Sequence, residues 1–327
     1  MSRVSYEATN ESKKDFGAIY QAPTPHAYLR EMSRLGYQIG EQARPYCDAV
    51  ASLMRELNGD AYPLTMLDVG CSYGLASAFV RYGCTFEEIV SFFDSRAPRD
   101  RVACAEAMRH WLNVVSPAHE MRVVGLDVSS PAVEFGLQSG LLDAGITKNL
   151  EVQGTVLDDQ ECDWIRSCGV LVSTGAIGYV SERTLGPVIH QLGRNCTGTF
   201  GPAAVFTVLR MFDIGPITRL FELVGWRCAS VPDVLLQQRK FASPREQAEI
   251  LARLEERGIA TDGCESEGIL VAQLFVASPS NTFDALMERM REVHRGTDEP
   301  GTLFSAHVEV ATTDPHVPVE TARETGS

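Results

Sequence analysis

The segment 64–81 constrains the fold of this chain more than any other. A short apolar run ends at Asp68, a turn of small residues follows, and a helical pattern begins at Leu75. This order is typical of a buried strand, a tight loop and a helix whose N-terminus faces a ligand. Gly70 and Gly74 allow the backbone to turn sharply and to approach that ligand closely. Such loops serve several nucleotides, so the segment alone predicts a nucleotide-type site without choosing its ligand.

A second strand-like run, residues 122–126, also ends in an acid, Asp127. A helical pattern then opens at Ser130 and Pro131, which are residue types favoured at a helix cap and in its first turn. A carboxylate at the end of this strand suits a ribose, because it can accept hydrogen bonds from both sugar hydroxyls. The alternative is that Asp127 only caps its own helix. Together the two acids predict a ribose-containing ligand more strongly than either does alone.

Strand-like and helical patterns alternate through the rest of the chain. Further strands are expected at 149–156, 169–174, 203–211, 234–241 and 269–277, and helices at 131–144, 181–193, 216–224, 244–257 and 281–295. Alternation of this kind favours a parallel sheet covered by helices on both faces. The sequence therefore predicts an α/β fold, a doubly wound and mostly parallel sheet of seven strands.

Other segments frame this core. Residues 1–15 and 296–327 are polar and lack periodicity, so we expect them to be disordered. Prolines at 23, 25 and 45 are expected to divide a helical cap at 16–60 into two or three short helices. The core domain spans 61–278 and holds a helical insertion at 84–120, a candidate lid or substrate wall, and a terminal helix covers 279–295.

Composition excludes several classes of function. The net charge of −14 and the absence of a basic run argue against a nucleic-acid partner. The nine cysteines form no CxxC pair and no zinc-like spacing, which predicts reduced thiols and no metal site. The polar start of the chain is unlike a signal peptide, and no apolar run would span a bilayer. We therefore expect a cytoplasmic protein with no membrane partner.

The loop from Asp68 to Gly74, the acid at Asp127 and the order of the strands resemble class I S-adenosylmethionine-dependent methyltransferases. The resemblance covers about residues 60–278 and extends to a bacterial subgroup with a CSYG loop. It implies S-adenosylmethionine as cofactor. The residues implied to bind it are Asp68, Gly70, Cys71, Ser72 and Gly74 in the loop, Asp127 at the ribose, Val128, Thr155 and Val156 at the adenine, and Ser173, Thr174 and Gly175 near the methyl group. Apart from the resemblance, Tyr20, Tyr28 and Tyr37 of the cap are candidates to close over the cofactor carboxylate or the substrate; the alternative is that this aromatic stripe is core.

The chain departs from the family pattern at three positions. Ser72 replaces the middle glycine of the loop, which is tolerable if its φ is negative. Cys168 precedes the fourth strand where an acid is usual. Thr155 replaces an acid often found beside the adenine amine, which leaves Asp158 or Asp159 as substitutes.

Two alternatives to a methyltransferase stay open. An NAD-dependent reductase would use G-x-G-x-x-G, whereas Gly70 and Gly74 give G-x-x-x-G, so the spacing favours the methyl donor. A protein that binds the cofactor as a regulator or partner, without transferring a methyl group, is the second alternative. The altered Ser72 and the missing acid at Cys168 motivate it.

The acceptor side is less defined. In-line methyl transfer needs alignment and exclusion of water, and it needs a base only when the acceptor loses a proton. Tyr179 and Asp213 are the candidate catalytic residues; otherwise Tyr179 is a helix-start aromatic and Asp213 a loop cap. Arg210 would bind an acidic acceptor or pair with a carboxylate. We expect a small-molecule acceptor in secondary metabolism, by family analogy, and a homodimer stays open.

Overall fold

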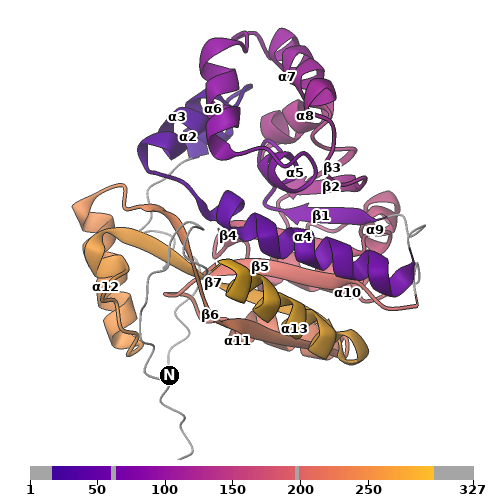
Figure 1. Ribbon diagram of the computed structural model, residues 1–327, viewed down its shortest axis with the longest axis vertical. Helices are drawn as coiled ribbons and strands as arrows, with labels where there is room; N and C mark the ends of the chain where they lie inside the picture. The colour runs from indigo at the N-terminus through magenta and orange to yellow at the C-terminus, as the bar shows by residue number, and fades with distance from the viewer. Residues whose placement is uncertain (1–16, 60–63, 196–198, 298–327) are drawn as a thin grey trace, which may run out of the picture.

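The computed structural model describes residues 17–59, 64–195 and 199–297, and within them seven strands form one sheet (Figure 1). The strands are β1 (Thr65–Val69), β2 (Arg122–Asp127), β3 (Ala144–Thr147), β4 (Val170–Ile177), β5 (Ala203–Leu209), β6 (Trp226–Lys240) and β7 (Ile269–Pro279). Their order across the sheet is β3-β2-β1-β4-β5-β7-β6. Strands β1 to β5 are parallel to one another, and β7 is antiparallel to both β5 and β6. The prediction of a mostly parallel, seven-stranded α/β sheet is confirmed.

Helices cover both faces of this sheet. They are α2 (Gly17–Tyr20), α3 (His26–Arg34), α4 (Ile39–Asn58), α5 (Leu75–Val80), α6 (Phe86–Ser95), α7 (Arg101–Val115), α8 (Ser130–Ser139), α9 (Asp159–Arg166), α10 (Glu182–Leu192), α11 (Gly215–Leu223), α12 (Pro244–Glu256) and α13 (Ser280–Thr297), with a short 3-10 helix at Glu265–Glu267. In Figure 1, α4 and α13 lie in front of the sheet and α10 and α11 behind it. None of the helices that the structure describes is both long and apolar enough to pass through a membrane.

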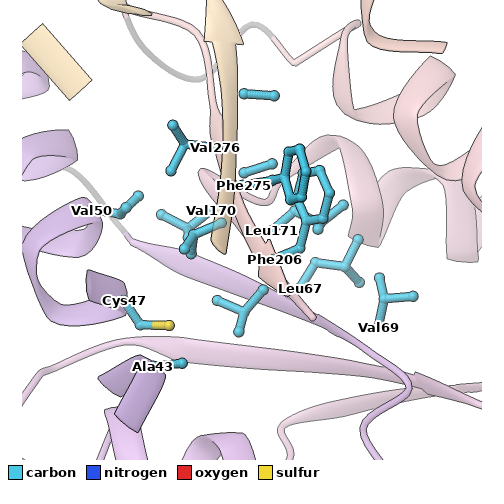
Figure 2. Packing of buried hydrophobic residues seen from close by; sticks show 14 of the residues in the cluster. Ala43, Cys47, Val50, Leu67, Val69, Val170, Leu171, Phe206, Phe275 and Val276 are labelled. Atoms are coloured by element: carbon cyan, nitrogen blue, oxygen red, sulfur yellow. The ribbon is translucent and has the colours of Figure 1, made fainter. Parts of the chain in front are cut away.

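The main core lies between the sheet and its helices. Every residue of β1 and of β5 is buried, as expected for central strands covered on both faces. Figure 2 shows side chains of neighbouring strands meeting those of α4, with Phe206 and Phe275 stacked at a centroid distance of 5.7 Å. This core fixes the ends of β1, β2 and β4, from which the site is built.

A second apolar cluster joins the cap to the insertion. Tyr28, Leu29 and Met32 of α3 belong to the same buried cluster as Phe92 and Met108 of the insertion. The insertion helices α6 and α7 therefore support the cap from outside through their own core.

Helix α4 differs from the sequence expectation, because it continues through Pro45 without a break. A proline inside a helix loses one hydrogen bond and crowds the preceding turn. Burial of the helix face that carries Ala43, Cys47, Val50 and Met54 offsets that loss. The prediction that Pro45 divides the cap helices is wrong.

The third strand also differs from its predicted position, because β3 ends at Thr147 and the expected strand at 149–156 is a series of turns. Gly140, at a φ of +80°, ends α8 early, so the strand starts before its expected position. The Asn149 side chain then accepts a hydrogen bond from the Glu151 amide, at 3.1 Å. Gly154 adopts a φ of +89°. A turn closed by the Asn149 side chain thus replaces the strand that was expected at 149–156.

Two further boundaries differ. Strand β6 begins at Trp226, ahead of the predicted 234–241, and bulges interrupt its pairing with β7. Helix α13 extends to Thr297, two residues into the segment expected to be disordered. The rest of that segment, 298–327, and the segment 1–15, also expected to be disordered, lie outside the described residues.

Candidate functional site

A cavity of about 770 Å³ lies at the carboxyl ends of β1, β2 and β4. The chain leaves β1 toward β2 on one side and returns to β4 on the other, so this edge is the switch point where open α/β sheets bind ligands. The volume falls within the roughly 300–1,000 Å³ typical of small-molecule sites. Helices α2 and α3 of the cap and the end of β6 close the remaining sides.

The loop after β1 forms the floor of the cavity. The amides of Gly70 and Cys71 donate to the Leu126 carbonyl, at 2.8 and 3.2 Å, which ties the loop to β2. Gly70 has a φ of +77°, and a Cβ added there would lie 2.3 Å from the Cβ of Ala176 on β4. Only glycine meets both conditions, because it allows positive φ and adds no side-chain atom.

Ser72 has a φ of +49°, so the condition under which a serine would be tolerated at this position without strain is not met. The Ser72 amide donates a hydrogen bond to Asp127 Oδ2 at 2.9 Å. This hydrogen bond holds the Ser72 backbone in the left-handed region. The Ser72 hydroxyl is buried in the cavity wall and has no hydrogen-bond partner among the residues described. The position therefore carries backbone strain and a polar group that a ligand in the cavity would satisfy.

We expect Ser72→Gly to raise the free energy of unfolding of the unliganded protein by about 1 kcal/mol, because glycine adopts positive φ without strain. The measurement is thermal or urea unfolding. Ser72→Ala is the matched control, because it removes the same hydroxyl and retains the strain. Equal stability of the glycine and alanine variants would show that the backbone at Ser72 is unstrained.

Asp68 is the most deeply buried acid of the cavity, with an exposed fraction of 2 %. Burial, together with the nearby charge of Asp127, raises the pKa of its carboxyl to about 8. Its Oδ2 atom has no hydrogen-bond partner within the described part of the chain. A cationic group in the cavity would stabilise the ionised carboxylate and satisfy this oxygen.

Asp127 ends β2 on the opposite side of the loop. Its Oδ2 accepts from the Ser72 amide and its Oδ1 from the Ser129 amide, both at 2.9 Å. Burial raises the pKa of this carboxyl, and the bonds from the Ser129 and Ser72 amides act in the opposite direction. Each carboxylate oxygen keeps a further lone pair, so Asp127 can accept from a pair of ligand hydroxyls while it fixes the loop.

The cap is fastened directly over these acids. The Tyr73 hydroxyl donates to the carbonyls of Ile19 and Ala22, at 2.9 and 2.7 Å. The Ser129 hydroxyl donates to the Tyr20 carbonyl at 2.5 Å. The second half of the CSYG loop thus positions α2 as a wall of the cavity.

Most of the residues that the sequence singled out meet in this one cavity. Those that line it are Tyr20, Tyr28, Asp68, Gly70, Cys71, Ser72, Asp127, Val128, Thr174, Gly175 and Tyr179. Acids and glycines from separate strands are therefore side by side, whatever ligand they serve.

Other predicted site residues lie outside the cavity lining. Gly74 caps α5 at a φ of +87°, and the Ser173 hydroxyl donates to the Val69 carbonyl at 2.8 Å, which ties β4 to β1. Thr155 and Val156 lie in the turns after β3, displaced with that strand. Asp213 is exposed, and its carboxylate accepts from the Gly215 amide at 3.0 Å at the start of α11. In this position Asp213 is a loop cap with no contact to the cavity.

The insertion and Arg210 also serve other roles. No residue of the insertion lines the cavity, and Phe92 stacks on Trp111 within the insertion at a centroid distance of 4.9 Å. The insertion at 84–120, all of which the structure describes, therefore forms no wall of this cavity. Arg210 forms a buried bidentate pair with Glu265, away from the cavity.

Sequence reasoning missed several wall residues because they come from unpredicted elements. Lys148 and Glu151 follow the true end of β3, and Gln238 and Arg239 belong to the bulged end of β6. Glu151 accepts from the Ser181 amide at 2.8 Å, so it fastens α10. A correct β3 boundary would have indicated Lys148 and Glu151. No local sequence signal indicates Gln238 and Arg239. Among the described residues, no group of histidine, cysteine and acidic side chains is arranged to hold a metal ion.

Comparison with known proteins finds neither a matching family model nor a matching curated protein. Similar solved structures include a TehB-like SAM-dependent methyltransferase from Corynebacterium glutamicum, with 13% identity, a TM-score of 0.36, and coverage of 76% of this chain and 94% of that one. Magnesium protoporphyrin IX methyltransferase from Synechocystis, with bound SAM, has 12% identity, a TM-score of 0.35, and coverage of 85% and 92%. The plantazolicin methyltransferase, in complex with an analogue and SAH, has 11% identity, a TM-score of 0.38, and coverage of 84% and 99%. At these values the similarities assign no residue a role.

Proposed function

We propose that this chain is an S-adenosylmethionine-dependent methyltransferase that acts on a small molecule. One observation carries the proposal: the loop at Gly70, the buried acid Asp68 and the strand-end acid Asp127 line a single cavity at the switch point of the sheet. The sequence motifs alone, which are far apart in the chain, do not show that these residues lie close together in space.

The residues present fit the cofactor. Asp68 offers a buried carboxylate oxygen to which none of the described residues is bonded, which suits the ammonium of the amino-acid portion. Asp127 has lone pairs left for the two ribose hydroxyls, and Val128 beside it offers an apolar contact for the adenine. The loop amides already donate hydrogen bonds to the Leu126 carbonyl and to Asp127. The loop region therefore offers the cofactor a surface of matching shape and hydrogen-bond acceptors.

When bound, S-adenosylmethionine supplies a methyl group activated by a sulfonium. The chain's own residues then hold and align the reactants and exclude water. Thr174 and Gly175 bring the end of β4 into the cavity wall, and Tyr20 and Tyr28 of the cap line it as well. Tyr179 lines the wall and is the candidate catalytic side chain, which would orient or deprotonate an acceptor. Enclosure by the cap favours a small acceptor over a macromolecule.

Calorimetric titration of the full chain tests the donor. S-adenosylmethionine and S-adenosylhomocysteine are expected to bind, and NADH under the same conditions is not. Formation of S-adenosylhomocysteine with a panel of small acceptors then tests transfer. Binding without turnover on any acceptor would favour a regulatory protein, and tighter binding of NADH would favour a reductase.

A pH dependence follows from Asp68. The pKa of its carboxyl is about 8 in the folded protein and roughly 4 in an unfolded chain, so folding takes up a proton between these values. The stability contributed by the neutral carboxyl is complete below about pH 4 and is lost as the pH rises toward 8. We expect Asp68→Asn to be increasingly more stable than the wild type over this window, by a few kcal/mol at pH 8. Unfolding of both proteins across the window, without cofactor, is the measurement; a constant difference would contradict the assignment.

The same variant separates stability from binding. At neutral pH, Asp68→Asn is expected to bind S-adenosylmethionine more weakly, because an amide cannot provide the negative charge that pairs with the ammonium. A more stable variant with unchanged affinity would remove Asp68 from the cofactor site.

A further inference from the structure

Part of the cavity wall is aromatic. We define the aromatic wall as Tyr20, Tyr28, Tyr37 and Tyr179, which all line the cavity. The rings of Tyr20 and Tyr28 lie 5.3 Å apart, and the Tyr37 hydroxyl forms hydrogen bonds with the side chains of Tyr28 and Thr174. Burial raises the pKa of Tyr37 to about 12, so this phenol stays neutral. Flat, neutral surfaces of this kind favour an aromatic ligand.

Gln238 lies in the same part of the cavity, on rigid backbone. Its carbonyl accepts from the Gln38 amide at 3.0 Å, and the next strand bond, from the Lys240 amide to the Leu35 carbonyl, is 2.7 Å. The end of β6 is thereby tied to the connection between α3 and α4. The backbone at Gln238 is consequently held in place relative to the cap.

The Gln238 amide oxygen is an unmatched acceptor. Nε2 lies 3.5 Å from the Gly175 carbonyl, and the reverse orientation would place two oxygens together. Oε1 is buried and has no partner in the part of the chain that the structure describes. Leaving such an oxygen unsatisfied is costly, so a ligand that donates a hydrogen bond there gains affinity.

The arginine next to Gln238 already has a counter-ion. Arg239 is buried and bound by both oxygens of the buried Glu246, at 3.0 and 2.7 Å. An acidic acceptor beside Gln238 would therefore leave water without gaining Arg239 as a counter-ion of its own, which is unfavourable.

We propose that the methyl acceptor is an uncharged aromatic compound with a hydroxyl or N–H group, and that Gln238 Oε1 accepts the hydrogen bond from that group. This inference rests on the proposed function, since it uses the cavity space that the cofactor leaves. Gln238 acts as a positioning and specificity-determining residue of the acceptor site. It is separate from the loop and acids assigned to the cofactor.

Matched probes test the inference on the full chain saturated with S-adenosylhomocysteine. Calorimetry or ligand-observed NMR compares a naphthol with its methyl ether and with the corresponding naphthoate. These share one ring system and differ in a donor group, its blocked form and a negative charge. We expect the naphthol to bind roughly tenfold more tightly than the ether, the size of one net hydrogen bond, and more tightly than the naphthoate.

Variants at Gln238 locate the effect. Gln238→Leu is expected to bring the naphthol and the ether to nearly equal affinity, without changing the affinity for S-adenosylhomocysteine. Gln238→Glu keeps an acceptor oxygen and should retain the preference for the naphthol. Gln237→Leu, on the neighbouring residue that does not line the cavity, should behave like the wild type.

The outcomes separate this inference from the function it rests on. Failure of S-adenosylhomocysteine to bind would overturn the proposed function. Normal cofactor binding with equal affinity for naphthol and ether, tightest binding of the naphthoate, no aromatic binding, or an unchanged preference in Gln238→Leu would each overturn the acceptor assignment alone.

Discussion

Alanine at position 70 is expected to abolish measurable S-adenosylmethionine binding and to lower the free energy of unfolding by about 2–5 kcal/mol. Two costs combine. The backbone of Gly70 adopts a φ of +77°, which an L-residue disfavours, and the new Cβ would lie 2.3 Å from the Cβ of Ala176. That neighbouring atom cannot rotate away, because a Cβ is fixed to its own backbone. The loop must therefore move off β4, which displaces Ser72 and its bond to Asp127.

Gly225→Ala is the matched control. Gly225 has nearly the same φ, +78°, but a Cβ there would meet nothing within 4 Å. We expect it to show the backbone cost alone, about 1–2 kcal/mol, with unchanged cofactor affinity. Calorimetric binding and urea unfolding of both variants provide the measurement. Equal behaviour of the two alanine variants would show that contact between Gly70 and Ala176 is unimportant.

The sequence predicted the parts of the site that follow from strand ends. Asp68, Gly70 and Asp127 could be placed because each ends or follows an apolar run, and parallel strands bring their carboxyl ends to one edge. The seven-stranded sheet followed from the same alternation. Here local pattern and tertiary structure agree.

Where the sequence failed, a non-local contact or a side-chain turn decided the structure. The polar turn at Asn149 replaced the expected strand, and Thr155 moved away from the cavity with it. Packing of α4 against the sheet carried the helix through Pro45. Gln238 reached the cavity only because β6 bulges and pairs with the connection between α3 and α4. Nothing in the residues around position 238 encodes that pairing.

Asp127→Ala is expected to weaken S-adenosylmethionine binding by about 30- to 100-fold, equivalent to roughly 2–3 kcal/mol. Loss of the charged acceptor for the ribose hydroxyls is one cause. Release of the Ser72 and Ser129 amides, each held by an Asp127 oxygen at 2.9 Å, is the other. Calorimetric titration measures the total effect.

Two variants divide these causes. Asp127→Asn keeps the shape and one acceptor oxygen, but it turns an amide NH₂ toward one of the two backbone N–H groups, so we expect an intermediate loss of affinity. Asp213→Ala removes an acid at the start of α11 that does not line the cavity, and its affinity should equal that of the wild type. A second ligand, S-adenosylhomocysteine, isolates the ribose contact. It should lose as much affinity as S-adenosylmethionine in Asp127→Ala, because both compounds carry the same ribose. A loss confined to the sulfonium compound would place Asp127 at the charged centre of the cofactor and would contradict its assignment to the sugar.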